Sequence, residues 1–152
     1  MRGELALVDT NILLTATDRS RPEHTAARTI FTQAIAAGVH LCITGQIIRE
    51  YLVVATRPVE LNGLGLTPDE SIHNIETFKR RMLFLEENEL VTSELLSLIR
   101  NCKLSGVSIH DANLIALMHV QNIRLIITQN PSDFADFPDI QIFSPGSFLE
   151  AL

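Results

Sequence analysis

Residues 5–14 read Leu-Ala-Leu-Val-Asp-Thr-Asn-Ile-Leu-Leu, an apolar run that three polar residues interrupt. The four residues before Asp9 are typical of a short, fully buried strand, because they are apolar without alternation. The triplet Asp9-Thr10-Asn11 then has two interpretations. It caps a helix that begins near Asn11, or it forms one corner of a functional site. The choice depends on whether other acidic residues occupy comparable positions later in the chain.

Further apolar segments of similar length follow along the chain, and we expect strands over residues 40–44, 83–85, 125–127 and 140–143. Helical patterns separate them, over residues 22–37, 45–56, 67–82, 92–102 and 108–120. Short apolar strands that alternate with helices are typical of a parallel sheet covered on both faces. The sequence therefore predicts an α/β fold.

The composition fits one folded domain over residues 1–152, because 46% of the residues are hydrophobic and 20% are charged. We find no secretion signal and no apolar run near the ~20 residues that span a bilayer. The cysteines, Cys42 and Cys102, form no metal-binding motif, so we expect free thiols, a reducing cytoplasm and no zinc. A net charge of −6 disfavours nucleic-acid binding through a broadly basic face. It leaves open a site that holds a few phosphates through a metal ion and local arginines.

Oxygen-rich side chains follow two of the predicted strands. Asp9 comes directly after the first strand, and Asn130 and Asp133 come just after the strand over residues 125–127. Functional residues of an open parallel sheet collect at the carboxyl ends of its strands. This placement favours a site at that edge, although Asp133 alone could be an ordinary loop acid.

Two more carboxylates lie on helix faces that are otherwise apolar. Glu50 lies at the edge of the apolar stripe of its helix, and Asp111 begins the almost entirely apolar face that includes Leu114. Simpler interpretations are a solvated Glu50 and an Asp111 that pairs with Ser108 as a helix cap. A cluster of like charges is destabilising unless a cation neutralises it. Oxygen ligands without histidine or cysteine favour Mg²⁺ or Mn²⁺.

The order of these motifs resembles that of the PIN-domain nucleases, and within them the VapC-type toxins of bacterial toxin–antitoxin pairs. The matching segments are Asp9-Thr10-Asn11, Arg49-Glu50, Asp111-Ala112-Asn113-Leu114 and Thr128-x-Asn130-x-x-Asp133-Phe134. The resemblance extends from Leu5 to about Pro145. It implies a three-layer α/β/α fold with a five-stranded parallel sheet.

The resemblance also implies the roles of the site residues. Asp9, Glu50 and Asp111 would bind the divalent metal, and Asn11 and Thr128 would support the site through hydrogen bonds. The sequence departs from the family at the fourth acid. Many members have an acid where this chain has Asn130, and Asp133 is either its replacement or a loop residue. The number of metal ions, one or two, stays open.

The function implied is that of a metal-dependent endoribonuclease, with Mg²⁺ or Mn²⁺ as cofactor and RNA as substrate. Arg49 and Arg57 are the candidates for phosphate contacts, because they lie near Glu50 in the sequence. The main alternative is a catalytically weak or inactive module that binds RNA or a protein partner, which Asn130 and the acidic net charge favour. A metal-dependent phosphatase or DNA nuclease is a third interpretation.

VapC-type proteins are usually dimers neutralised by an antitoxin. By analogy we expect a homodimer in the cytoplasm, a cognate antitoxin and no membrane association. Leu61, Leu64 and Leu66 lie in a loop that contains Gly63 and Gly65. They either contact a partner or fold back onto their own core.

Overall fold

The computed structural model describes every residue from Met1 to Leu152. Its strands form one five-stranded parallel sheet, as expected, and their order in the sheet is β3-β2-β1-β4-β5. The strands are β1 (Leu5–Val8), β2 (His40–Thr44), β3 (Leu83–Leu85), β4 (Leu125–Ile127) and β5 (Gln141–Phe143). The helices are α1 (Thr10–Thr17), α2 (His24–Ala37), α3 (Gly45–Thr56), α4 (Pro68–Lys79), α5 (Glu89–Cys102), α6 (Ser108–Val120) and α7 (Pro145–Ala151). Two short 3₁₀ helices are η1 (Val59–Leu61) and η2 (Pro131–Phe134).

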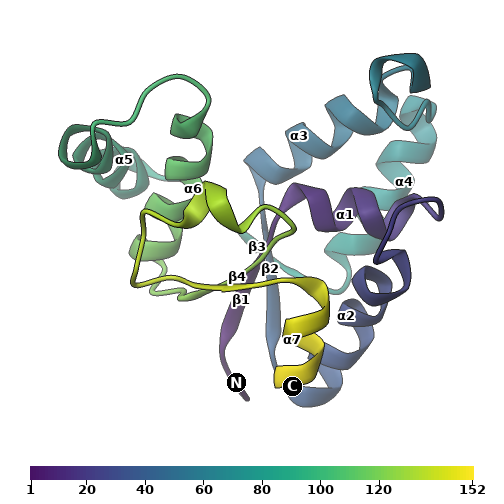
Figure 1. Ribbon diagram of the computed structural model, residues 1–152, viewed down its shortest axis with the longest axis horizontal. Helices are drawn as coiled ribbons and strands as arrows, with labels where there is room; N and C mark the ends of the chain where they lie inside the picture. The colour runs from purple at the N-terminus through teal and green to yellow at the C-terminus, as the bar shows by residue number, and fades with distance from the viewer.

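Helices cover the sheet on both faces, which confirms the three-layer α/β/α fold. In Figure 1, α5 and α6 lie to the left of the sheet, and α1, α2 and α7 lie to its right. Helix α3 packs against α1 and α4, and both chain ends lie at the lower end of the molecule (Figure 1). None of the helices combines the length and the apolar character that crossing a membrane requires.

The chain builds the sheet outward from the central strand β1, first in one direction and then in the other. From β1 the chain first adds β2 and β3 on one side, and later β4 and β5 on the other. The carboxyl ends of β1 and β4 are therefore neighbours, with Val8 opposite Ile127. This is the switch point at which open α/β sheets place their ligands, because the flanking connections diverge there. The next residues along the two strands are Asp9 and Thr128.

Two predicted helix boundaries are wrong by three residues. Helix α4 ends at Lys79 rather than Met82, because the chain must turn before Leu83 pairs with Cys42 of β2. Helix α5 begins at Glu89 rather than Thr92. The side chain of Asn88 caps it by accepting hydrogen bonds from the next backbone N–H groups, an N-cap signal that the apolar spacing does not reveal.

Helix α7 has no counterpart among the predicted helices. Ser144 caps it, Pro145 occupies its first turn, and Ser147 Oγ accepts a hydrogen bond from the backbone N–H of Ser144. These are strong start signals, but only seven residues follow the cap in the helix. So short a helix shows little periodicity and depends on packing, which Phe148 supplies by its complete burial.

The three leucines of the loop after α3 differ in whether they pack on the core or are exposed to a partner. Leu64 and Leu66 pack against the core, and their backbone N–H groups donate to carbonyls of α3 at 3.0 and 2.9 Å. Leu61 instead is 60% exposed. Leu64 and Leu66 therefore fold back onto the core, and of the three leucines only Leu61 remains available to a partner.

Candidate functional site

Asp9 both caps a helix and lies at the carboxyl edge of the sheet, so the two interpretations of the opening triplet are compatible. The residue has extended backbone angles and precedes the first turn of α1. Its Oδ1 accepts a hydrogen bond of 2.6 Å from the backbone N–H of Thr10. Its Oδ2 accepts from Asn11 Nδ2 at 2.7 Å and from Thr128 Oγ1 at 2.6 Å. The carboxylate is thus held from two segments of the chain.

Thr128 and Asn11 join the ends of β1 and β4 around this carboxylate. Thr128 Oγ1 accepts hydrogen bonds from Asn11 Nδ2 and from the backbone N–H of Asn130, both at 3.0 Å. Asn11 Oδ1 accepts from the backbone N–H of Gln129 at 3.1 Å. Each polar group has a partner, which fixes the orientation of Asp9.

Burial raises the pKa of Asp9, which is only 9% exposed. Hydrogen bonds from Thr128 and Thr10 lower it in part, and the nearby charge of Glu50 raises it further. A buried carboxylate that is already hydrogen-bonded still favours an additional positive charge. Asp9 therefore has the environment of a cation ligand.

Glu50 is half-buried on α3 and is held through both of its oxygens. Oε2 accepts a hydrogen bond of 2.7 Å from Thr10 Oγ1, and Oε1 accepts one of 2.8 Å from Gln46 Nε2. Gln46 also donates to the backbone carbonyl of His110 at 2.9 Å and accepts from Asn113 Nδ2 at 2.8 Å. The network thereby connects α1, α3 and α6 at one edge of the sheet.

Asp111 lies in the first turn of α6, half-buried and near the other acids. Burial, together with neighbouring carboxylates, raises its pKa to about 6. In order of their effect those neighbours are Asp133, Asp9 and Glu50. The cap interpretation is wrong, because the Ser108 hydroxyl donates to the Ser105 carbonyl at 2.8 Å and no side chain caps α6.

The structure separates the two candidates for the fourth acidic position. Asn130 is exposed, and its contacts to the site are made by its backbone, through the N–H that donates to Thr128. Asp133 lies in η2 and is the carboxylate with the largest charge effect on Asp111. The negative charge on this side of the site therefore comes from Asp133.

The two arginines differ in their relation to Glu50. Arg49 is the residue before it, is exposed, and forms no ion pair. Arg57 ends α3, about 10 Å further along the helix axis by the 1.5 Å rise per residue. Arg49 is accordingly the closer candidate for a phosphate contact.

Three polar residues of this hydrogen-bond network are not predicted as site residues from the sequence. The sequence motifs assign no role in the site to Thr10, Gln46 or Gln129. The spacing of Gln46, four residues before Glu50, was a usable signal because such residues are neighbours on a helix face. No comparable signal marks Gln129, whose contacts to Thr15 and Glu23 depend on the folded chain.

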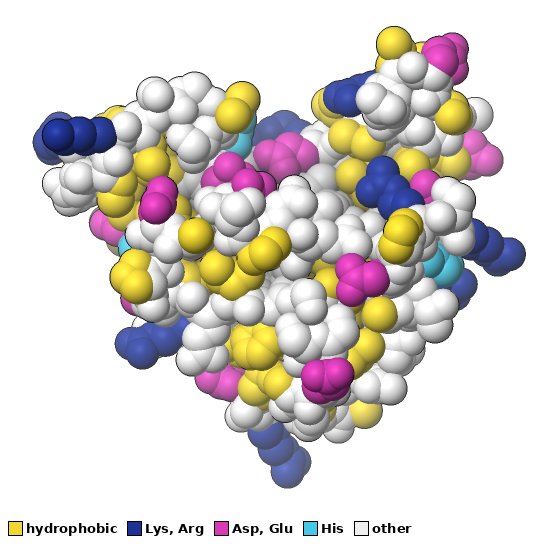
Figure 2. All heavy atoms as spheres, in the orientation of Figure 1, with side chains coloured by type: hydrophobic (Ala, Val, Ile, Leu, Met, Phe, Trp, Pro, Cys, Tyr) yellow, Lys and Arg dark blue, Asp and Glu magenta, His cyan; other side chains and the backbone are white.

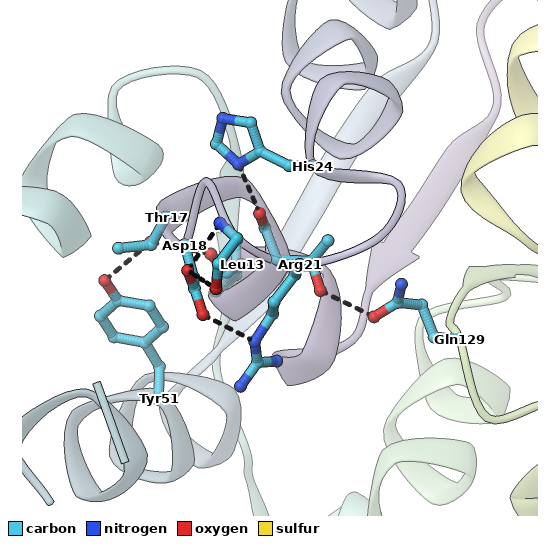
Figure 3. A network of polar contacts seen from close by, with 9 residues as sticks. Leu13, Thr17, Asp18, Arg21, His24, Tyr51 and Gln129 are labelled. Carbon is cyan, nitrogen blue, oxygen red and sulfur yellow. Dashed lines mark hydrogen bonds and ion pairs between the residues drawn. The ribbon is translucent and has the colours of Figure 1, made fainter. Parts of the chain in front are cut away.

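The far end of α1 is anchored by a second set of polar contacts, shown in Figure 3. Thr17 and Tyr51 share a hydrogen bond of 3.0 Å between α1 and α3. The ring of His24 contacts the Thr15 carbonyl at 2.8 Å, and the Thr15 hydroxyl donates to Gln129 at 2.7 Å. Helix α1 is thus fixed at both ends, and with it the backbone of Asp9.

The side-chain chemistry of the site fits a hard divalent cation. Asp9, Glu50, Asp111 and Asp133 offer only oxygen atoms, and none forms an ion pair with lysine or arginine. Figure 2 shows acidic side chains at the base of the notch between the α5–α6 side and the α3–α4 side of the molecule. No three histidine, cysteine, aspartate or glutamate side chains are arranged so that they could hold one metal ion together. A cation would have to draw these like-charged groups closer.

A model of the PIN domain matches residues 6–140 of this chain. The chain belongs to the PIN domain family. One curated relative is Ribonuclease VapC48 of Mycobacterium tuberculosis, which is 30% identical over 143 residues. The alignment covers 91% of this chain and 96% of VapC48.

Solved structures share the fold of this PIN domain at lower sequence identity. VapBC2 from Rickettsia felis, bound to a DNA fragment from its promoter, superposes with a TM-score of 0.67 at 14% identity, and the match covers 92% of this chain and 98% of the other. A toxin–antitoxin complex from Klebsiella pneumoniae gives 0.60 at 20% identity, covering 92% and 97%. The PIN-domain match, from residue 6 to 140, includes every site residue from Asp9 to Asp133.

Proposed function

We propose that this PIN-domain protein is a VapC-type endoribonuclease that hydrolyses RNA phosphodiester bonds with a bound Mg²⁺ or Mn²⁺ ion. The observation that carries the proposal is the gathering of Asp9, Glu50, Asp111 and Asp133 at the switch point of the sheet without a cationic partner. The 30% identity to a ribonuclease supports RNA as the substrate.

Asp9, Glu50 and Asp111 are the residues that would hold the cation. Asp133 adds negative charge on the side of Asp111. A bound divalent cation would promote hydrolysis in two ways, by stabilising negative charge on a phosphate and by lowering the pKa of a coordinated water. The protein's own side chains supply the remaining roles, among them the orientation of these carboxylates.

The hydrogen bonds to these carboxylates direct their remaining lone pairs. Thr128 and Asn11 hold Oδ2 of Asp9, and Thr10 and Gln46 each hold one oxygen of Glu50. A carboxylate has about four lone-pair positions, so each group keeps room for a cation while its rotamer is fixed. Such outer contacts orient metal ligands and commonly change affinity or activity when they are lost.

The proposal is tested by incubating the purified protein with a structured RNA. We expect cleavage with Mg²⁺ or Mn²⁺, and none with EDTA or in Asp9→Asn. Asp136→Asn, which removes a carboxylate from an exposed loop residue, should cleave like the wild type. Cleavage that survives both EDTA and Asp9→Asn would contradict the proposal.

A second candidate function is binding of RNA or of a protein without cleavage. Two observations favour it: the amide at Asn130 and the separation of the acids, which leaves no three of them arranged around one position. Titration with Mn²⁺ distinguishes the two functions, since a binding module has no need of a cation in this site.

We also propose a homodimer and a cognate antitoxin as partners. The toxin–antitoxin complex from Klebsiella pneumoniae shares the fold and supports the antitoxin. Exposed apolar residues on one side of the molecule offer a protein contact, namely Val53, Val59, Leu61 and Ile72 on α3, η1 and α4. Light scattering on the purified chain measures the oligomer directly, and a monomer at all concentrations would contradict the homodimer.

A further inference from the structure

One aromatic side chain is exposed at the edge of the sheet. Phe84 of β3 is 46% exposed, whereas the other six phenylalanines and the tyrosine are buried or half-buried. Strand β3 pairs with β2 alone and is one of the two edge strands. Single exposed apolar side chains are common on protein surfaces, so the groups around this ring, rather than its exposure, are informative.

Two cations accompany this ring. Lys79 Nζ lies 5.4 Å from the ring centroid, within the range of a cation–π contact. Arg49 Nη1 and Phe84 Cζ both approach the place where a side chain on Gly45 would begin, at 3.3 and 4.0 Å from an ideal Cβ. The guanidinium and the ring therefore lie close together, over a residue that has no side chain to separate them.

Neither cation is neutralised by the protein. Arg49 and Lys79 have no carboxylate within the 4.0 Å of an ion pair. The chain carries 18 acidic and 12 basic residues, so two unpaired cations beside one exposed ring are not explained by a general excess of positive charge. They match a negatively charged ligand that also has a flat apolar face.

Phe84 and Arg49 lie near the carboxyl ends of the strands, where the carboxylates also lie. Phe84 pairs with Ile43, one position before Thr44, which caps α3. Arg49 directly precedes Glu50 on that helix. The helix thus presents Glu50 and Gln46 to the acidic site and Arg49 to the edge strand.

We propose that Phe84, Arg49 and Lys79 form a subsite for single-stranded RNA next to the scissile phosphate. A base stacks on the Phe84 ring, and flanking phosphates contact the two cations. The subsite rests on the proposed function, since it extends the path of an RNA substrate away from Glu50. The exposed acids Glu86 and Glu87 follow β3 and would repel phosphates, so the bound RNA extends from the ring toward Lys79 rather than toward these acids.

A protein partner on this edge fits the observations less well. An apolar partner surface would bury Arg49 and Lys79 without a counter-charge, which is costly. A partner strand added to β3 would use the backbone and would not need the ring or the cations. RNA satisfies the ring and both charges at once.

The absence of tryptophan from the chain allows a direct test. Phe84→Trp places the only tryptophan in the subsite. Leu83→Trp places it one residue earlier on the same strand, where the side chain points to the opposite face of the sheet. Leu83 is 48% exposed, nearly as much as Phe84, and is therefore a matched control. A labelled single-stranded RNA 12-mer of mixed sequence is titrated in EDTA, which prevents cleavage.

We expect RNA to quench the emission of Trp at position 84 in a saturable way and to leave that of Trp at position 83 unchanged. By fluorescence anisotropy, Phe84→Ala should bind the RNA about 5- to 150-fold more weakly, the range measured for loss of base stacking, and Phe84→Trp should restore binding. Leu83→Ala should bind like the wild type.

The cations are tested through the salt dependence of the same binding. Arg49→Gln and Lys79→Gln should each reduce the slope of log affinity against log salt by about 0.7, the contribution of one phosphate contact to a single strand. Arg124→Gln removes an exposed cation just before β4, which lies on the other side of the central strand from β3, and should leave the slope unchanged.

The outcomes separate the subsite from the proposed function. If the wild type cleaves RNA but tryptophan at position 84 is not quenched and Phe84→Ala binds normally, the subsite is overturned and the nuclease stands. If the wild type neither binds nor cleaves RNA, both are overturned. Quenching by a co-purified protein and not by RNA would also overturn the subsite.

Discussion

The hydroxyl of Thr10 donates a hydrogen bond of 2.7 Å to Glu50, a residue 40 positions later in the chain. The backbone N–H of the same threonine donates to Asp9 at 2.6 Å. One residue at the start of α1 therefore orients two of the three proposed cation ligands. The middle residue of the opening triplet, which the sequence left without a role, connects the two acids.

Thr10→Val tests this relationship, because it keeps the shape of the side chain and removes the donor to Glu50. We expect RNA cleavage to fall by roughly 10-fold, the effect typical of losing a contact that orients a metal ligand. Thr10→Ser, which keeps the hydroxyl, should retain most of the activity. Thr17→Val at the other end of α1 is the control, because it removes a bond to Tyr51 and none to the acids. Equal losses of activity in the Thr10 and Thr17 valine variants would refute the role of Thr10.

Gln46→Met should destabilise the protein through loss of a buried polar connection. Gln46 is 4% exposed and bonds to Glu50, Asn113 and the carbonyl of His110. Methionine fills a similar volume but leaves these partners unpaired, at a cost of about 2–4 kcal/mol in the free energy of unfolding. Urea denaturation measures the change, and Gln33→Met on the exposed face of α2 should have little effect. Unchanged stability in Gln46→Met would mean that water replaces the lost contacts.

Asp111 should make stability depend on pH in the absence of a metal. Its pKa rises from 3.8 to about 6 on folding, so the folded state binds the proton more tightly than the unfolded state. The free energy of unfolding therefore falls as pH rises from about 4 to about 6, and the loss is complete above that range. With allowance for solvent screening of this half-exposed group, the loss is about 1 kcal/mol.

Asp111→Asn removes this dependence, since the amide does not titrate. In EDTA we expect its urea midpoint to exceed that of the wild type near neutral pH and to match it more closely at about pH 4.5. Asp136→Asn, in an exposed loop, should follow the wild type at both pH values. A wild type that gains stability between about pH 4 and 6, relative to Asp111→Asn, would have the opposite sign and would exclude charge repulsion at this position.

Asn130→Asp introduces a carboxylate at the position where the resemblance to the family leads us to expect an acid. The new carboxylate would lie two residues after Thr128 and add to the charge of Asp133. We expect Mn²⁺ to bind about 10-fold more tightly, because affinity for hard cations rises with the number of charged ligands. Without the cation, the variant should be slightly less stable than the wild type. Ser132→Asp adds the same charge to the exposed loop of η2, and an equal gain of affinity there would show a general rather than a positional effect.

The strands were accessible from the sequence because burial on both faces requires unbroken apolar runs. Leu5–Val8 is such a run, and its bounds in the structure are those expected. The start of α3 at Gly45 was equally clear from the strand that ends before it. By contrast, α7 depends on the burial of Phe148 against distant residues, and seven residues carry too little periodicity to reveal it.

The acids of the site were accessible for a related reason. A carboxylate at a strand end or on an apolar helix face is unusual enough to be noticed in isolation, as Asp9 and Asp111 show. The groups that orient them are ordinary polar residues whose role lies in long-range hydrogen bonds. The contact between Thr10 and Glu50 and that between Gln46 and Asn113 exist only once three helices meet. Likewise, the path of η2 determines that Asp133, and not Asn130, supplies the negative charge beside Asp111.

The central claim is that these carboxylates together hold a divalent cation, and calorimetric titration of Mn²⁺ into the metal-free protein tests it most directly. We expect a saturable binding heat in the wild type, its loss in Asp9→Asn and in Asp111→Asn, and its retention in Asp69→Asn, which alters an exposed acid of α4. The absence of any binding heat in the wild type, or an equal heat in the wild type and in Asp9→Asn, would contradict the claim.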